Sequence, residues 1–156
     1  MKKKYKTLFL LHGAFSDHTG WLRKTNIEKY AEQYNLAVVM PDMANSFYAN
    51  LVHGPDYWTF VSEELPRFAR RIFPLSAERE DNFVAGLSMG GYGAFKLALN
   101  KPEQYAAAIS LSGVMDVVSA MQNKARPIFK IEDYFGSLEN FNGTCNDLHY
   151  LLKKAT

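Results

Sequence analysis

The residue in this sequence with the clearest chemical potential is Ser88, in the pentapeptide Gly86-Leu87-Ser88-Met89-Gly90. The pentapeptide matches the pattern G-x-S-x-G, in which a nucleophilic serine occupies a tight turn between a strand and a helix. Glycines two positions before and after the serine remove side chains that would clash in such a turn. A helix that begins just after the serine presents backbone N–H groups and positive potential, which stabilise a developing oxyanion. The spacing therefore predicts acyl-transfer chemistry at Ser88, against the alternative of a glycine-rich turn with an idle serine.

The residues on either side of the pentapeptide fit that geometry. The apolar run Phe83–Ala85 is typical of a buried parallel strand. The run that contains Ala94, Phe95 and Leu97 is typical of a helix packed on a sheet, and two further glycines, Gly91 and Gly93, stand near its start. We therefore expect a strand, a sharp turn at Ser88 and a helix in direct succession.

Strand and helix patterns alternate along the rest of the chain. Besides Phe83–Ala85, strands are predicted over Thr7–Leu11, Leu36–Met40 and Ala106–Leu111. Between the first two, apolar residues at Ile27, Tyr30, Ala31 and Tyr34 have the spacing of an amphipathic helix.

Two more helices are predicted further along. Asp56 could cap a helix whose apolar face carries Trp58, Val61, Leu65, Phe68, Ala69 and Ile72, and Pro66 should kink or divide it. From Ser112 to Thr144 the chain reads as loop with short helical turns. Asn146 or Asp147 could cap a final helix that turns Leu148, Leu151 and Leu152 inward.

This alternation predicts a single α/β domain over residues 1–156, with a mainly parallel sheet and helices on both faces. Active sites in such sheets lie at the carboxyl ends of the strands. His12-Gly13, Pro41-Asp42 and the turn at Ser88 all follow predicted strands, so we expect them to line one site.

Composition excludes several classes of partner. A net charge of +2 over 156 residues gives no reason to expect nucleic acid, and no apolar stretch approaches the ~20 residues of a membrane span. No signal peptide is apparent, and the single cysteine, Cys145, cannot form an internal disulfide, so we expect a cytoplasmic protein. No cluster has metal-ligand spacing, and we expect neither metal nor cofactor.

Four segments together resemble a known family, the esterase D group of α/β-hydrolases, and within it the bacterial tributyrin esterases and S-formylglutathione hydrolases. They are Leu10–Trp21 (L-L-H-G-A-F-S-D-H-T-G-W), Val38–Asp42 (V-V-M-P-D), Tyr57–Pro74 and Ala85–Leu99 (A-G-L-S-M-G-G-Y-G-A-F-K-L-A-L). The resemblance implies an α/β-hydrolase fold. It also implies a serine carboxylesterase that hydrolyses short-chain esters, or thioesters, through an acyl-serine intermediate.

The resemblance also assigns roles to individual residues. Ser88 corresponds to the nucleophile, and the backbone N–H of Met89 corresponds to one oxyanion donor. The second donor corresponds to Ala14, the residue after His12-Gly13, with Phe15 as the fallback.

The family's acid and base follow the nucleophile in the order Ser, Asp, His, on two further strands. This sequence stops before such a region, and its resemblance to the family starts at the third strand of the family's sheet, so we expect a fold that is incomplete at both ends. Asp116 is the candidate acid, with a loop or capping role as the favoured alternative. Of the histidines, His12 is expected to fix its turn rather than act as base, whereas His18 and His53 could approach Ser88. His149 is expected to be exposed on the final helix.

Because the family's acid and base region is missing, we expect weak activity or none if the chain ends at residue 156. An incomplete sheet also has a consequence for association. Family strand order puts the Thr7 and Phe83 strands in the centre and the Leu36 and Ala106 strands at the edges. Unpaired edges expose backbone groups and apolar side chains, so we expect self-association through an edge, or recruitment of a further segment. The alternative to an esterase is a catalytically silent hydrolase-like binding module.

Overall fold

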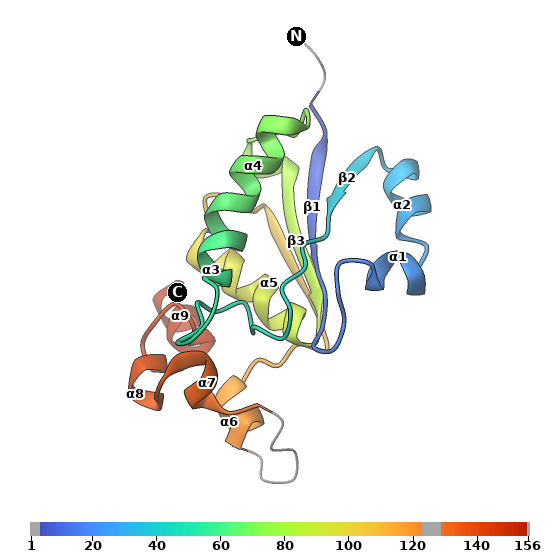
Figure 1. The fold of residues 1–156 in the computed structure, drawn as a ribbon. Coiled ribbons are helices and arrows are strands. Elements are labelled where there is room, and N and C mark those ends of the chain that lie inside the picture. Colours follow the sequence, from blue (N-terminus) through green and yellow to red (C-terminus); the bar gives the residue numbers. More distant parts are fainter. Residues whose placement is uncertain (1–3, 123–128, 156) are drawn as a thin grey trace.

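A four-stranded parallel sheet organises the molecule, which is seen in a computed structural model that describes residues 4–122 and 129–155. The strands are β1 (Lys6–Leu11), β2 (Leu36–Val39), β3 (Asn82–Leu87) and β4 (Ala107–Leu111), and their order in the sheet is β2-β1-β3-β4. The predicted strand positions, the parallel sheet and the central place of β1 and β3 are therefore confirmed (Figure 1).

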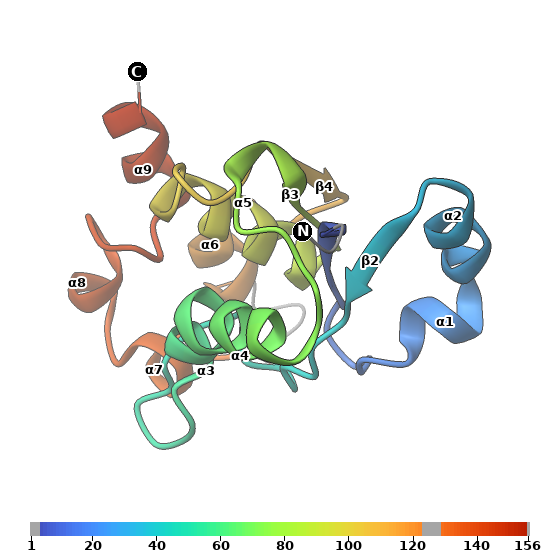
Figure 2. The ribbon, with the colours of Figure 1, turned by 90° about the horizontal axis from the view of Figure 1, so that it is seen from above.

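Helices cover both faces of this sheet, as predicted (Figure 2). On one side lie α1 (Gly20–Lys24) and α2 (Ile27–Gln33), beside β2. On the other side lie α3 (Tyr57–Thr59), α4 (Leu65–Ile72) and α5 (Met89–Asn100). Helix α5 packs on the strands β3 and β4 and is apolar on nearly all sides, so most of its side chains are buried.

The helix predicted to start at Asp56 is divided, and the reason is Pro66. Its ring cannot donate a backbone hydrogen bond, and the turn before it widens into a π-helical segment, Phe60–Glu64, in which the N–H of Leu65 bonds to the carbonyl of Phe60. Val61, Leu65 and Ala69, four residues apart, form the inward stripe, in which Val61 and Ala69 are buried and Leu65 is partly buried; Ser62 and Pro66 beside it are also buried.

Three expectations about this helix were wrong. Phe68 and Ile72 were placed on the buried face, but they are about three-fifths exposed because they lie off the stripe of residues four apart. The Asp56 side chain makes no capping hydrogen bond, because the chain enters α3 from a bridge between Asn50 and Asp56.

The region after β4 contains short helices, as predicted. They are α6 (Val117–Gln122), α7 (Ile131–Phe135), α8 (Leu138–Phe141) and α9 (Leu148–Ala155); residues 123–128 of the predicted loop lie outside the described residues. Asp147 caps α9, with its Oδ1 accepting from the N–H of Tyr150 at 3.0 Å. Leu148 and Leu151 are buried, but Leu152, also predicted to face inward, is half exposed.

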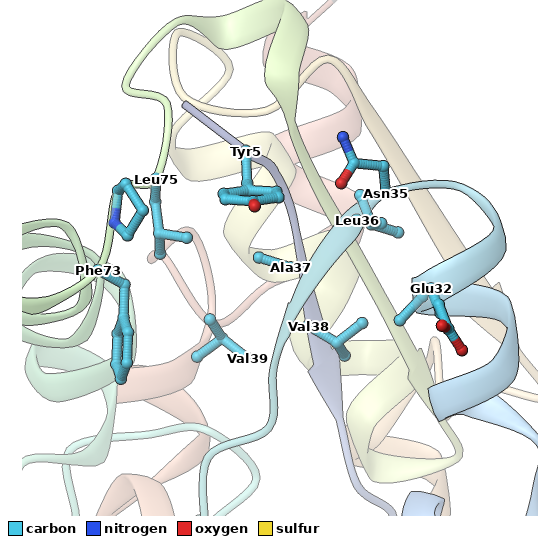
Figure 3. A pocket seen from close by; sticks show the side chains of 11 residues that line it. Tyr5, Glu32, Asn35, Leu36, Ala37, Val38, Val39, Phe73 and Leu75 are labelled. Carbon is cyan, nitrogen blue, oxygen red and sulfur yellow. The ribbon is translucent and has the colours of Figure 1, made fainter. Parts of the chain in front are cut away.

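The sheet is open in two places. On β3 and β4, the face turned away from α5 exposes Leu87, Ile109 and Leu111, each by roughly half. At the other end, β2 pairs with β1 alone, and its free edge forms the floor of an apolar groove of about 530 Å³ (Figure 3). Phe73 and Leu75 lie on one side of this groove and Glu32 on the other (Figure 3). The predicted edge strands are therefore the edges observed.

None of the helices in the described part of the chain combines the length and hydrophobicity that a membrane crossing needs.

A buried lysine distinguishes the core from an ordinary apolar one. Lys96, on α5, has no solvent exposure, and its Nζ lies 4.4 Å from the centre of the Trp58 ring. Burial lowers the pKa of Lys96 to about 7, because the charged form loses its hydration. No carboxylate among the described residues lies within ion-pair distance of it.

This burial predicts a pH-dependent stability. Between pH 7 and the usual lysine value of 10.5, the unfolded chain binds a proton that the folded chain lacks, so the free energy of unfolding rises with pH in that window. The slope for one proton approaches about 1.4 kcal/mol per pH unit. This slope is measured by urea denaturation of the wild type and of Lys96→Met. The pH range runs from 6 to roughly 9.5, which stays below the range in which tyrosines titrate. The stability difference between the two should shift in favour of the wild type as pH rises. Parallel profiles would show that the folded protein keeps the ammonium charged.

Candidate active site

Ser88 lies in a strained turn between β3 and α5. Its backbone has φ 55° and ψ −116°, a conformation that a non-glycine residue rarely adopts and that is typically found at functional sites. A Cβ on Gly86 would overlap the backbone of Gly90, and a Cβ on Gly90 would overlap the carbonyl oxygen of Leu11 and lie 2.7 Å from that of His12. Both glycines of the pentapeptide are therefore required by contacts with backbone atoms, which cannot move aside.

The hydroxyl of Ser88 is free to react. The backbone of Ser88 is anchored, with its N–H donating to Leu111 O at 2.9 Å and its carbonyl accepting from Tyr92 N at 3.1 Å. No side chain in residues 4–122 or 129–155 hydrogen-bonds to its hydroxyl. Two cavities, of about 210 and 290 Å³, are both lined by Ser88, so the hydroxyl faces space that a substrate can fill.

Two backbone N–H groups from separate segments lie beside this serine. Met89 is the first residue of α5, where an N–H has no partner within the helix. Ala14 lines both cavities with Ser88, and its N–H has no acceptor among the described residues. Gly13 brings the two segments together, because a Cβ built on it would lie 3.5 Å from the Cβ of Ser88.

The N–H of Phe15, the fallback donor, has another partner. It donates to Asn45 Oδ1 at 2.7 Å, and Phe15 itself has a positive φ of 61°. This contact comes from the loop after β2, and nothing in the spacing of the sequence indicated it. Among the two residues considered for the second donor, the geometry favours Ala14.

His12 uses both ring nitrogens to fix the turn that carries Ala14. Its Nε2 accepts from the N–H of Met43 at 2.9 Å, which leaves the proton on Nδ1, and that nitrogen lies 2.8 Å from Gly13 O. The imidazole is 2% exposed. It cannot also take a proton from Ser88, so it has the structural role that was expected of it. The indole of Trp21 donates to Leu11 O at 3.1 Å and supports the same turn.

The other histidines lie elsewhere. His18 is exposed, with its Nδ1 3.6 Å from Asp42 Oδ2. His53 borders a separate cavity with Asp133 and Tyr134, and His149 is exposed on α9. None of these three lines either cavity at Ser88.

Asp116 begins α6 rather than facing the serine. Its two carboxylate oxygens accept from the backbone N–H and the hydroxyl of Ser119, at 2.9 and 2.6 Å, and these bonds lower its pKa. It lines a cavity that contains His149 but not Ser88. The structure thus brings together Ser88, Met89, Ala14 and Phe15, and leaves Asp116 apart.

Aromatic side chains line the larger of the two cavities. Apolar residues surround it on most sides, namely Ala14, Phe15, Phe47, Met89, Val114, Ala120, Met121 and Phe129. Phe47 contributes to this wall, whereas the next residue, Tyr48, is fully buried and does not line the cavity. No group of three or more potential metal-ligating side chains gathers anywhere in the described parts of the chain.

The parallel sheet, its helices on both faces and the strand–turn–helix at Ser88 define the fold as that of the α/β-hydrolases. The chain belongs to the esterase family described as "Putative esterase", which its sequence matches over residues 1–140.

Individual relatives agree with this assignment. An acetyl esterase from Caldicellulosiruptor saccharolyticus is 33% identical, in an alignment that covers 96% of this chain and 59% of the relative. The solved structure of FphF, a fluorophosphonate-binding serine hydrolase of Staphylococcus aureus, superposes with a TM-score of 0.90 at 43% identity, covering 99% of this chain and 60% of that one. The S-formylglutathione hydrolase FrmB of the same organism gives 0.84 at 42% identity, with the same coverage. The chain thus spans about three-fifths of the length of these relatives.

The turn at Ser88 predicts a sharp response to one added methyl group. In Gly90→Ala the new Cβ meets backbone carbonyls of β1 and the following turn, so we expect a loss of about 3 kcal/mol or more in unfolding free energy. Urea denaturation measures it.

Gly20→Ala is the matched control, because its Cβ meets only the hydroxyl oxygen of Ser16 closely, and rotation of that side chain moves the oxygen away. Equal stability of the two variants would contradict the crowding described here.

Proposed function

We propose that this protein is a serine carboxylesterase that hydrolyses short-chain acyl esters, or thioesters, through an acyl-serine intermediate. The observation that carries the proposal is Ser88 in a strained turn, with a hydroxyl that no described side chain bonds, at the border of a cavity that Ala14 and Met89 also line. The family and the esterase relatives support it. The chain spans about three-fifths of those relatives, so the activity is proposed for the whole protein.

The proposed reaction begins with attack of Ser88 Oγ on the carbonyl carbon of the ester while a base takes the hydroxyl proton. The carbonyl oxygen then carries a full negative charge, to which Met89 N–H and Ala14 N–H donate; each such donor is worth roughly 3 kcal/mol of barrier. Collapse of this intermediate expels the alcohol or thiol, which receives the proton. Water attacks the acyl-serine by the same route and regenerates Ser88.

None of the four histidines, in its observed position, can act as the base that takes the Ser88 proton. In serine hydrolases, loss of a triad member leaves only about 10³–10⁴-fold acceleration over water. We therefore expect weak turnover from these 156 residues alone, and Asp116 is assigned no step because Ser119 occupies both of its oxygens.

We assign the acyl group to the cavity of about 290 Å³ lined by Phe15, Phe47 and Met121. Its apolar wall favours a short alkyl chain, such as the butyryl groups of tributyrin, over a charged acyl group. The cavity of about 210 Å³ includes Ser16, Lys24 and Thr25 and suits a more polar leaving group. We further propose a cytoplasmic location, since the chain's one cysteine can form no internal disulfide.

Covalent labelling tests the proposed nucleophile. We expect a fluorophosphonate probe to label the folded chain slowly and short-chain p-nitrophenyl esters to be hydrolysed weakly. Both should be lost in Ser88→Ala and kept in Ser137→Ala, which removes a serine that caps α8. A folded sample that takes no label would favour the second candidate function, a silent binding module. The specific observation for that function is that His12, which lines a cavity with Ser88, has both ring nitrogens engaged elsewhere.

We also propose that two copies associate through the free edge of β2. The edge residues Leu36–Val39 carry no charge and no proline, the features that commonly block edge pairing. Antiparallel pairing of β2 with β2 of a second copy would bond the free backbone groups reciprocally about a twofold axis, with apolar side chains such as Phe73 at the rim.

Sedimentation velocity at several concentrations tests this association. We expect concentration-dependent dimers that Val38→Lys abolishes, because the new ammonium would be buried in the groove at the edge. Asn140→Lys adds the same charge on the exposed face of α8 and should leave dimers intact. A monomeric wild type at every concentration would refute the pairing.

A further inference from the structure

The buried Lys96 is fully hydrogen-bonded without an acidic partner. Its Nζ donates to the backbone carbonyl of Tyr48 and to Asn146 Oδ1, both at 2.6 Å, and it lies over the ring of Trp58. Buried amines without hydrogen-bond partners are very costly, so a lysine at this position is tolerated only because these acceptors converge on it. One side chain thus connects α5, the loop after β2 and the segment before α9.

The carbonyl that Lys96 holds belongs to a strained loop. Phe47 and Tyr48 have φ of 48° and 52°, and Ala44 nearby has φ of 46°. Non-glycine residues in this region cost free energy and persist only where the surroundings fix them. The ring of Tyr48 is fixed as well, because it packs on the backbone of Gly93, where a Cβ would lie 2.5 Å from it. Lys96 and Gly93, one turn apart on α5, therefore fix both the backbone and the ring of Tyr48.

The far end of Tyr48 reaches the segment that carries Ala14. Its hydroxyl donates to the carbonyl oxygen of His12 at 2.8 Å, and this bond is buried. The direction of the His12 carbonyl fixes the His12–Gly13 peptide plane, and the next peptide plane along the chain holds the N–H of Ala14. A hydrogen bond at this point therefore restricts the direction in which the Ala14 N–H points.

We propose that Tyr48 is a positioning residue for the oxyanion donor at Ala14, and that Lys96 acts through Tyr48 to keep it in place. The proposal rests on the proposed esterase function for its catalytic meaning. It does not depend on the charge of Lys96: burial lowers its pKa to about 7, and the neutral amine still has two N–H groups for the two oxygens. Neither residue touches the reacting atoms, and neither would be found from the G-x-S-x-G pattern.

The test removes one oxygen atom from each of two buried tyrosines in the full chain. Tyr48→Phe deletes the bond to His12 O. Tyr105→Phe is the matched control, because Tyr105 is also buried, packs on Phe9 and has no hydrogen-bond partner for its hydroxyl among the described residues. Two readouts are compared: the amide resonances of Gly13, Ala14 and Met89 in ¹H–¹⁵N spectra, and the rate of fluorophosphonate labelling.

We expect Tyr48→Phe to shift the Gly13 and Ala14 resonances, to leave Met89 in place, and to slow labelling by about 10- to 100-fold, less than complete loss of a donor would. When labelling is measured at several probe concentrations, Tyr48→Phe should lower the maximal labelling rate and leave the half-saturating probe concentration unchanged. Tyr105→Phe should match the wild type in both readouts. Lys96→Met should slow labelling in the same direction, and the double variant with Tyr48→Phe should be no slower than the slower single variant.

Unchanged Ala14 resonances and an unchanged labelling rate in Tyr48→Phe would overturn the proposal. Equal effects of Tyr48→Phe and Tyr105→Phe would also overturn it, since they would mean that loss of any buried tyrosine oxygen loosens the core. If the wild type takes no label, the proposed function fails, but the amide resonances still decide whether Tyr48 positions Ala14.

Discussion

The site depends above all on the close approach of two backbone segments. The first turn of α5 lies directly against the end of β1, so closely that Gly90 has no room for a methyl group beside the carbonyls of Leu11 and His12. That approach joins the two strands whose ends carry Ser88 and Ala14. A serine and a backbone donor from distant parts of the chain can cooperate only if their relative position varies by well under 1 Å. Backbone-to-backbone contact is the stiffest means of achieving that, since no rotamer can relax it.

Buried hydrogen bonds surround this contact between the α5 and β1 backbones. His12 bonds to Met43, Tyr48 bonds to His12, and Lys96 bonds to Tyr48, so the turn carrying Ala14 is connected to α5 by a continuous series of hydrogen bonds. Each of these groups is almost fully buried, where an unsatisfied polar atom is expensive and a satisfied one restricts its neighbours strongly. The apolar core gives the molecule its cohesion, and these bonds give the turn one orientation.

Much of this architecture could be predicted from local patterns. The strands, their parallel order and the turn at Ser88 follow from short apolar runs and from glycines whose spacing has a steric cause, and β1 to β4 agree with the predictions to within a few residues. The exposed faces of Phe68 and Ile72 could not be predicted, because regular helical spacing does not reveal a π-turn ahead of Pro66. The roles of Asn45, Tyr48 and Lys96 could not be predicted from the sequence for a different reason. Each acts on a residue 30 or more positions away, and one sequence carries no sign of such pairs.

The bond between Lys96 and Asn146 has a consequence for how the chain is made. The two residues are 50 positions apart, and Asn146 stands close to the C-terminal end of the described chain. During synthesis, helix α5 is made before this second acceptor exists. A chain that ends before residue 146 leaves the amine of Lys96 with the Tyr48 carbonyl as its remaining acceptor and lacks the bond that joins α5 to the segment before α9.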